Sequence, residues 1–414
     1  MPTELVLCLA VFVAAYAVVS GRLTADFLTA PMIFVGAGLF VGPGVELMGE
    51  DARSAIEPLA EVTLALVLFG DAARIDLSAL RKSLGLPTRL LGIGLPLTIL
   101  LGAGIAMAVL GGLSLWEAAV LSAVLAPTDA ALGQAVVSSE VVPLRIRQTL
   151  NVESGLNDGI ALPVVLALTA FAAMSGEGAD HWLGFWGLQV TLGPLVGAAV
   201  GWGGGRLFTW AEKAGWTEHS TQRIGGMALA IVALLGAEFV GGNGFIAAFV
   251  AGLTLGNTAW SFCERIHEFL EAESQLMMMF VFGALGAVLA GPAMSRATPA
   301  MLLYAGLSLT VVRMVPVAVS LIGSKLRWQS VLFVGWFGPR GLASLLFGIV
   351  VLDEHAVLHR EFMFDVVVIT VLFSVLLHGL TASWGAKRYG RWVAEQIADQ
   401  AAVAEHSSGT GVVL

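Results

Sequence analysis

Apolar runs of about twenty residues recur along the whole chain, and few ionisable residues interrupt them. A transmembrane helix needs about 20 largely apolar residues. The composition agrees, because 57% of the 414 residues are apolar and only 12% are charged, which is about half the charged share of a typical soluble domain. The sequence therefore predicts an all-α polytopic membrane protein. It excludes an ordinary soluble enzyme, and it excludes a nucleic-acid-binding protein, which would need a basic patch.

Thirteen of these runs are predicted to span the membrane. They cover residues 5–20, 28–45, 55–70, 90–110, 115–137, 146–174, 182–208, 224–240, 245–259, 276–291, 300–323, 331–352 and 362–384. Of the 21 lysines and arginines, 16 fall in one set of connecting loops and three in the other. The positive-inside rule then places the C-terminus in the cytoplasm and the N-terminus outside. The expected location is the cell membrane, specifically the inner membrane of a bacterium.

The two halves of the sequence resemble each other. Ala37-Gly38-Leu39-x-x-Gly42 recurs as Ala251-Gly252-Leu253-x-x-Gly256, Phe69-Gly70 recurs as Phe282-Gly283, and Pro127 matches Pro339. The offsets are 214, 213 and 212 residues, which is seven spans each time. Because seven is odd, the two repeats are predicted to have inverted topology, an arrangement common in secondary transporters.

A proline interrupts the fifth span in Ala126-Pro127-Thr128-Asp129 and the twelfth span in Gly338-Pro339-Arg340-Gly341. Irregular backbone at membrane depth must line a cavity. The sequence therefore predicts two broken helices that cross near the middle of the membrane. Half-helix ends carry partial charges, and Asp129 and Arg340 have suitable signs to balance them.

The sixth span holds further ionisable residues, and charge within a span marks a functional site by default. Ser154 and Asp158 are four residues apart and share a helix face, whereas Glu153 points in a different direction. Together with Asp129 and carbonyl groups freed near Thr128, they could supply oxygen ligands to a hard monovalent cation such as Na⁺. Burial disfavours a charged carboxylate, so protons would compete with the cation. The alternative is that these groups only stabilise helix packing.

Three more ionisable residues need an account. Arg340 must be paired at its depth, and Glu153 is the preferred partner because it points away from the predicted ion face. Arg313, in the eleventh span, either pairs with a carboxylate or binds carbonyl groups. Asp71, at the end of the third span, is either an interfacial cap or a residue of a cytoplasmic funnel. Arg313 and Asp71 are candidate accessory residues of the site.

The motifs around Asp129, Asp158 and Arg340 resemble those of the monovalent cation/proton antiporters, in the NhaP-like branch of the sodium/proton exchangers. The segments 68–71 and 242–252 are similar to further stretches of that family. The resemblance implies that Asp158 is the central carboxylate. It also implies that Thr128, Asp129, Ser154 and Asn157 are neighbouring ion-binding positions. Glu153 and Arg340 are implied to form a structural ion pair.

The same resemblance implies a homodimer in the lipid bilayer with a panel and a mobile core that shifts like an elevator. The expected divisions are residues 1–85 (panel, spans 1–3), 86–175 (core, spans 4–6), 176–219 (linker span 7), 220–297 (panel, spans 8–10), 298–386 (core, spans 11–13) and 387–414 (a short cytoplasmic tail). The chain departs from the family pattern at Ala130, where proline is usual, and at Pro339, where leucine is more frequent.

The function expected from these features is secondary active exchange of Na⁺ for H⁺ by alternating access, with Li⁺ or K⁺ as alternative cations. No enzyme activity and no cofactor is expected, since no phosphate-binding loop is visible and the two cysteines have no metal-ligand spacing. In related electrogenic antiporters the residue before the central aspartate is also aspartate, as the resemblance implies. Here it is Asn157, so exchange is expected to be electroneutral. The competing interpretation is a Na⁺-coupled transporter of another solute on the same fold.

Overall fold

The computed structural model describes residues 11–20, 28–46, 50–75, 85–129, 132–173 and 179–409. Residues 5–10 of the first predicted span and Ala130 lie outside these ranges. Every regular element within them is helical. After a first helix, Val11–Ser20, the order is α2 (Ala30–Glu46), α3 (Glu50–Ala73), α5 (Leu86–Arg89), η1 (Leu90–Gly94), α6 (Leu95–Val109), α7 (Leu115–Val124), α8 (Gln134–Val137), α9 (Leu144–Ala173), α10 (Ala179–Lys213), α11 (His219–Phe239), α12 (Gly244–Thr258), α13 (Trp260–Ala284), η2 (Leu285–Ala290), α14 (Gly291–Ser295), α15 (Pro299–Leu309), α16 (Val311–Ser320), α17 (Trp328–Trp336), α18 (Leu342–Asp353) and α19 (Arg360–Gly409).

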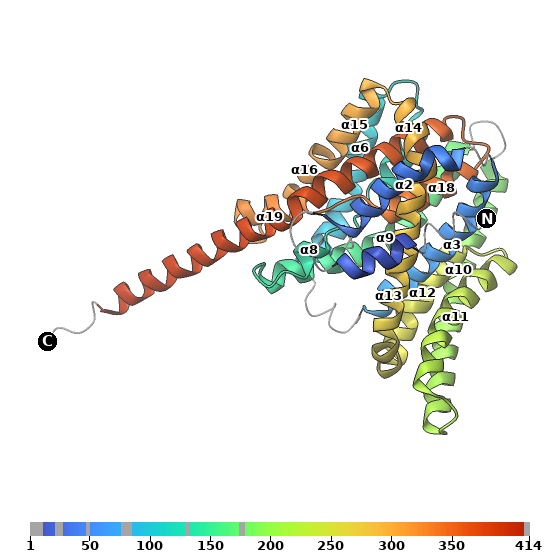
Figure 1. Ribbon diagram of the computed structural model, residues 1–414, viewed down its shortest axis with the longest axis horizontal. Coiled ribbons are helices and arrows are strands. Elements are labelled where there is room, and N and C mark those ends of the chain that lie inside the picture. The colour runs from blue at the N-terminus through green and yellow to red at the C-terminus, as the bar shows by residue number, and fades with distance from the viewer. Residues whose placement is uncertain are drawn as a thin grey trace.

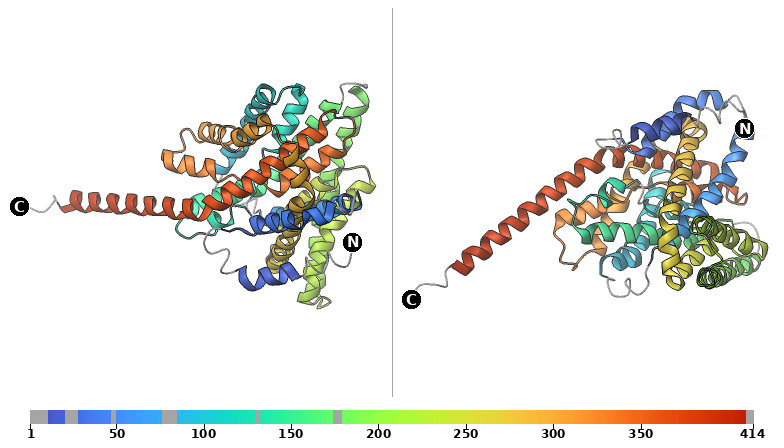
Figure 2. Two further views of the ribbon diagram at one scale, coloured as in Figure 1. Left: turned by 45° about the horizontal axis from the view of Figure 1, so that its top comes forward. Right: turned by 60° about the horizontal axis from the view of Figure 1, so that its bottom comes forward.

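Among the described residues, six helices are long and apolar enough to cross a membrane, and five shorter apolar helices accompany them. The helices pack into a bundle from which the C-terminal part of α19 extends (Figures 1 and 2). The molecule is an all-α, multi-span membrane protein, which confirms the predicted fold class at this level.

Two helices stop where the sequence places a proline inside an apolar run. Helix α7 ends at Val124, before Pro127, and α17 ends at Trp336, before Pro339. Proline has no N–H group for the helical ladder, and it disfavours helical geometry in the residue before it. The chain becomes helical again only at α8 and α18. A third interruption, at Thr310 between α15 and α16, falls inside a run that the sequence predicts as one continuous span.

The glycine motifs of the two sequence halves lie in matching close contacts. A Cβ atom on Gly38 of α2 would meet the carbonyl oxygen of Gly283, and one on Gly252 of α12 would meet that of Phe69. Gly42 and Gly256 lie in the same way against the carbonyl oxygens of Ala287 and Ala73.

Both pairs of contacts are related by the same offset of 214 residues. We call these two interfaces, α2 with α13–η2 and α12 with α3, the glycine seams. Small residues let helix backbones approach closely, and such packing helps to hold helices together in a membrane.

A side-chain cap fixes where the first half-helix, α7, begins. At the start of α7, the Ser114 Oγ accepts from the Glu117 N–H at 3.2 Å, and Glu117 Oε2 accepts from the Ser114 N–H at 2.9 Å. The other carboxylate oxygen of Glu117 accepts from the His359 N–H at 3.0 Å. The first half-helix is thereby tied to the loop that precedes α19.

Candidate functional site

The two proline-containing breaks meet in the interior. The Asp129 N–H donates to the Pro339 carbonyl oxygen at 2.8 Å. The Leu342 N–H, at the first position of α18, donates to Asp129 Oδ2, also at 2.8 Å. A Cβ atom on Gly341 would collide with the Asp129 carboxylate, so the close approach requires glycine there. Asp129 therefore places its negative charge at the positive end of α18.

Arg340 performs the opposite role at the end of α7. Its side chain is fully buried, and Nη1 donates to the carbonyl oxygens of Ala126 and Pro127, the latter at 3.0 Å. These carbonyls lie just beyond α7, where the helix dipole is negative. The predicted balance of half-helix ends by Asp129 and Arg340 matches these contacts.

The predicted ion pair between Glu153 and Arg340 is wrong. Arg313 Nη1 and Nη2 donate to Glu153 Oε1 and Oε2 at 2.6 and 2.8 Å. Arg313 thus pairs with a carboxylate, which was one of its two predicted alternatives. The physical reason is that the carbonyl groups freed at the end of α7 already engage Arg340, and the two-pronged geometry of an arginine matches one carboxylate best.

Helix α9 presents two polar side chains, Ser154 and Asn157, to the break after α7. Ser154 Oγ donates to the Thr128 carbonyl oxygen at 2.5 Å, and Asn157 Nδ2 donates to Thr128 Oγ1 at 2.7 Å. Asp158 is 8% exposed. Among the described residues, Asp158 Oδ1 and Asn157 Oδ1 are buried oxygens without a hydrogen-bond partner. Buried polar atoms normally have a hydrogen-bond partner, so these two oxygens need an explanation.

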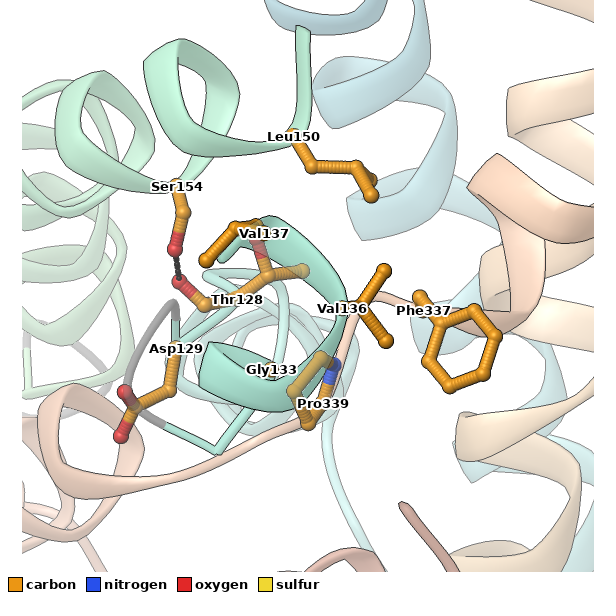
Figure 3. Close-up of a pocket in the computed structure, with 9 residues that line it drawn as sticks. All are labelled: Thr128, Asp129, Gly133, Val136, Val137, Leu150, Ser154, Phe337 and Pro339. Atoms are coloured by element: carbon orange, nitrogen blue, oxygen red, sulfur yellow. Dashed lines mark hydrogen bonds between the residues drawn. The ribbon is translucent and has the colours of Figure 1, made fainter. Parts of the chain in front are cut away.

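A small pocket lies beside these groups. Thr128, Asp129 and Ser154 line it on one side, while apolar side chains, including Leu150 and Phe337, close the other (Figure 3). Asp158 and Asn157 do not line this pocket; they follow Ser154 by one turn of α9. The structure therefore brings Thr128, Asp129 and Ser154 together at one opening, and Asp158 lies one turn further along α9.

Asp71 lies in the last turn of α3, and its role at the site stays a prediction. Hydroxyl, amide, carboxylate and carbonyl oxygens are the donors that hard cations prefer. No cluster of three His, Cys, Asp or Glu residues suited to a resident metal occurs in the described ranges.

Two residues at this site were absent from the sequence-based prediction. Ser374 and His378 of α19 are both buried and contact the break before α18. The usable signal was the histidine, since a titratable residue in an apolar span merits the same attention as an aspartate. Ser374 carries no such signal, because serine is common at helix interfaces in membranes.

The fold is that of a helical multi-span membrane protein, and its candidate site lies where two interrupted helices meet. Residues 8–388 match the family described as "Sodium/hydrogen exchanger, transmembrane". The chain belongs to this family, and it is therefore a multi-pass membrane protein of a cofactor-free transporter family and not an enzyme.

Curated relatives and solved structures agree with the family. The chain is 26% identical to a K⁺/H⁺ antiporter NhaP of Alkalimonas amylolytica over 81% of its length, and 24% identical to a K⁺/H⁺ antiporter NhaP2 of Shewanella oneidensis over 86%. It spans 57% and 62% of these two relatives. The fold matches the sodium proton antiporter MjNhaP1 of Methanocaldococcus jannaschii with a TM-score of 0.73 and 22% identity, covering 93% of this chain and 96% of that one.

Proposed function

We propose that the protein is a secondary active antiporter that exchanges a monovalent cation for H⁺ across the membrane. The observation that carries the proposal is the buried oxygen cluster formed by Thr128, Ser154, Asn157 and Asp158, with two oxygens unpartnered. A dehydrated cation needs several such oxygens, and a proton on Asp158 would satisfy the same carboxylate in its absence. One site that holds either substrate, but not both, is sufficient for exchange.

The roles of the individual residues follow from their contacts. Asp158 binds either the cation or the proton, and Thr128, Asp129, Ser154 and Asn157 complete or orient the ligand set. Asp129 and Arg340 balance the ends of the two half-helices, so the interrupted backbone stays in place without water. The Glu153–Arg313 pair keeps two buried charges matched beside the site. Substrate release and uptake on the two sides would occur by alternating access.

The molecular organisation forms part of the same proposal. It comprises thirteen spans, inverted repeats, two crossed broken helices and a homodimer with the panel and core divisions given above. The glycine seams and the meeting of the two breaks are compatible with this organisation. The cytoplasmic C-terminus and external N-terminus rest on the distribution of basic residues.

The test is exchange by the purified chain in proteoliposomes that carry a preformed acidic interior and a quenched pH-sensitive dye. Addition of Na⁺, Li⁺ or K⁺ should restore the fluorescence with the wild-type protein, and choline should not. The most effective cation identifies the substrate, since two relatives are named for K⁺ and the structural neighbour for sodium. Dequenching that requires a second solute besides Na⁺ would support the competing Na⁺-coupled transporter, and the lack of any cation response would overturn both.

A further inference from the structure

The backbone between α17 and α18 has left helical geometry, and part of its hydrogen bonding comes from α19. The Arg340 N–H donates to Ser374 Oγ at 2.7 Å. His378 Nε2 lies 2.9 Å from the Trp336 carbonyl oxygen, a group that also accepts from the Gly338 N–H. An unpaired backbone group at this depth would be costly, so α19 stabilises the break from both of its ends.

Ser374 and His378 also contact each other. His378 Nδ1 lies 3.0 Å from the Ser374 carbonyl oxygen and 3.2 Å from Ser374 Oγ, and the Ser374 hydroxyl accepts from the Arg340 N–H. On the other side of the ring, Nε2 faces the Trp336 carbonyl oxygen. The imidazole therefore links α19 to the end of α17.

This arrangement is unusual for α19 itself. Serine and threonine hydroxyls within helices commonly bond to the carbonyl group four residues earlier. Thr370, one turn before Ser374, does this with the Val366 carbonyl at 2.7 Å. Both side chains are fully buried, yet only Ser374 accepts a bond from the interrupted segment.

The geometry points to a new role for this pair: we propose that Ser374 and His378 are positioning residues of the ion site. They hold residues 336–340 so that the Pro339 carbonyl meets the Asp129 N–H and the Arg340 guanidinium reaches the end of α7. They touch neither the cation nor Asp158. This inference rests on the proposed antiport function, because it assigns the pair to that site.

The first test separates affinity from maximum rate in the proteoliposome assay. Ser374→Ala leaves the buried Arg340 N–H without its partner and should raise the apparent KM for the cation about tenfold. His378→Ala should raise it less, because the Trp336 carbonyl keeps its hydrogen bond from the Gly338 N–H. The maximum rate should change much less. Thr370→Ala is the matched control, since it removes a buried hydroxyl from the same helix without touching the break, and its KM should equal that of the wild type.

The second test does not depend on transport. Hydrogen–deuterium exchange of the peptide that contains residues 336–342 should be faster in Ser374→Ala and His378→Ala than in Thr370→Ala. His378→Gln should restore part of the protection and part of the affinity, because its amide N–H can reach the Trp336 carbonyl.

The outcomes are distinguishable. If the wild type exchanges cations, but the two alanine variants keep its KM and its protection, the positioning role is wrong and the antiport proposal stands. If Thr370→Ala is impaired equally, the effect is general packing and the inference is also overturned. If the wild type shows no exchange, the antiport proposal fails, while the hydrogen exchange still reports whether α19 holds the break. Should an alanine variant not fold, Ser374→Cys and His378→Gln replace it, since the thiol keeps the volume but is a weak acceptor.

Discussion

Asp158 combines deep burial with an oxygen that no described group satisfies. Replacing it by asparagine keeps the size of the side chain and removes the charge and the exchangeable proton. We expect Asp158→Asn to reduce cation-driven dequenching to the level of liposomes without protein, because both substrates need this carboxylate. Its melting temperature in detergent should equal or exceed that of the wild type, since a buried carboxyl group has been replaced by a neutral amide. Exchange at the wild-type rate would remove Asp158 from the mechanism.

The Glu153–Arg313 pair makes a second prediction at this scale. Removing one partner of a buried ion pair costs about 3–5 kcal/mol, so Glu153→Gln and Arg313→Gln should each lower the melting temperature clearly. The double variant should lose much less than the sum of the two, because each single change strands the other charge.

A parallel cycle with Glu153→Gln and Arg340→Gln supplies the control for that prediction. Arg340 bonds to carbonyl groups and not to Glu153, so this second pair of changes should be closer to additive. Stronger coupling to Arg340 than to Arg313 would reverse our assignment of the ion pair.

The sequence predicted which side chains lie together at the candidate site better than it predicted how they pair. Spacing on one helix separated Glu153 from the face that carries Ser154 and Asp158, because positions on a helix follow from its geometry alone. The partner of Glu153 could not be predicted in the same way, since two buried arginines, Arg313 of α16 and Arg340 of the break before α18, competed for it. That choice depends on how α16 and this break pack in three dimensions, and no local pattern carries this information.

At the scale of elements, α7 and α17 end before a proline, and the helices of the glycine seams pack closely because glycine has no side chain. Pro127 and Pro339 located both breaks in advance, since proline acts on the local backbone. The interruption at Thr310 was missed because no proline or glycine marks it. The matching glycine motifs indicated a repeat, but the sequence did not say that each motif packs against the other half of the chain.

The glycine seams can be tested with two glycines of one helix. A Cβ atom on Gly38 would collide with the backbone of residues 283–287, whereas one on Gly36 would meet nothing within 4 Å. We expect Gly38→Ala to destabilise the protein by about 1–3 kcal/mol, as overpacking does. Gly36→Ala should cost nothing, because alanine is the better helix former. Thermal unfolding of both variants in the same detergent provides the measurement, and equal stability would mean that α2 shifts freely away from α13 and η2.

For the whole molecule, the charge carried per cycle follows from which carboxylates stay ionised. Glu153 is matched by Arg313, Asp129 is held at the start of α18, and Asn157 cannot ionise. Asp158 is then the main group that exchanges a proton for a cation, so we expect one H⁺ for one monovalent cation.

Initial rates of Na⁺-driven exchange should therefore not change when a membrane potential is imposed or collapsed with valinomycin and K⁺. The matching control is Asn157→Asp, which adds a second carboxyl group and should introduce a dependence on voltage if that group also titrates. A clear dependence on voltage in the wild type, or a current on a supported membrane that scales with turnover, would contradict a one-to-one exchange.

The glycine seams also have a mechanical meaning. Where two helix backbones are in direct contact, no layer of side chains lies between them that could rearrange. One helix can slide along the other only if a carbonyl oxygen passes a neighbouring Cα atom. Each seam therefore holds its two helices together as one rigid unit. Any displacement of the ion site must then be absorbed where side chains meet instead, at contacts such as the Arg296–Asp365 pair between the end of α14 and α19, which is 2.6 Å long and solvent-exposed on its arginine side.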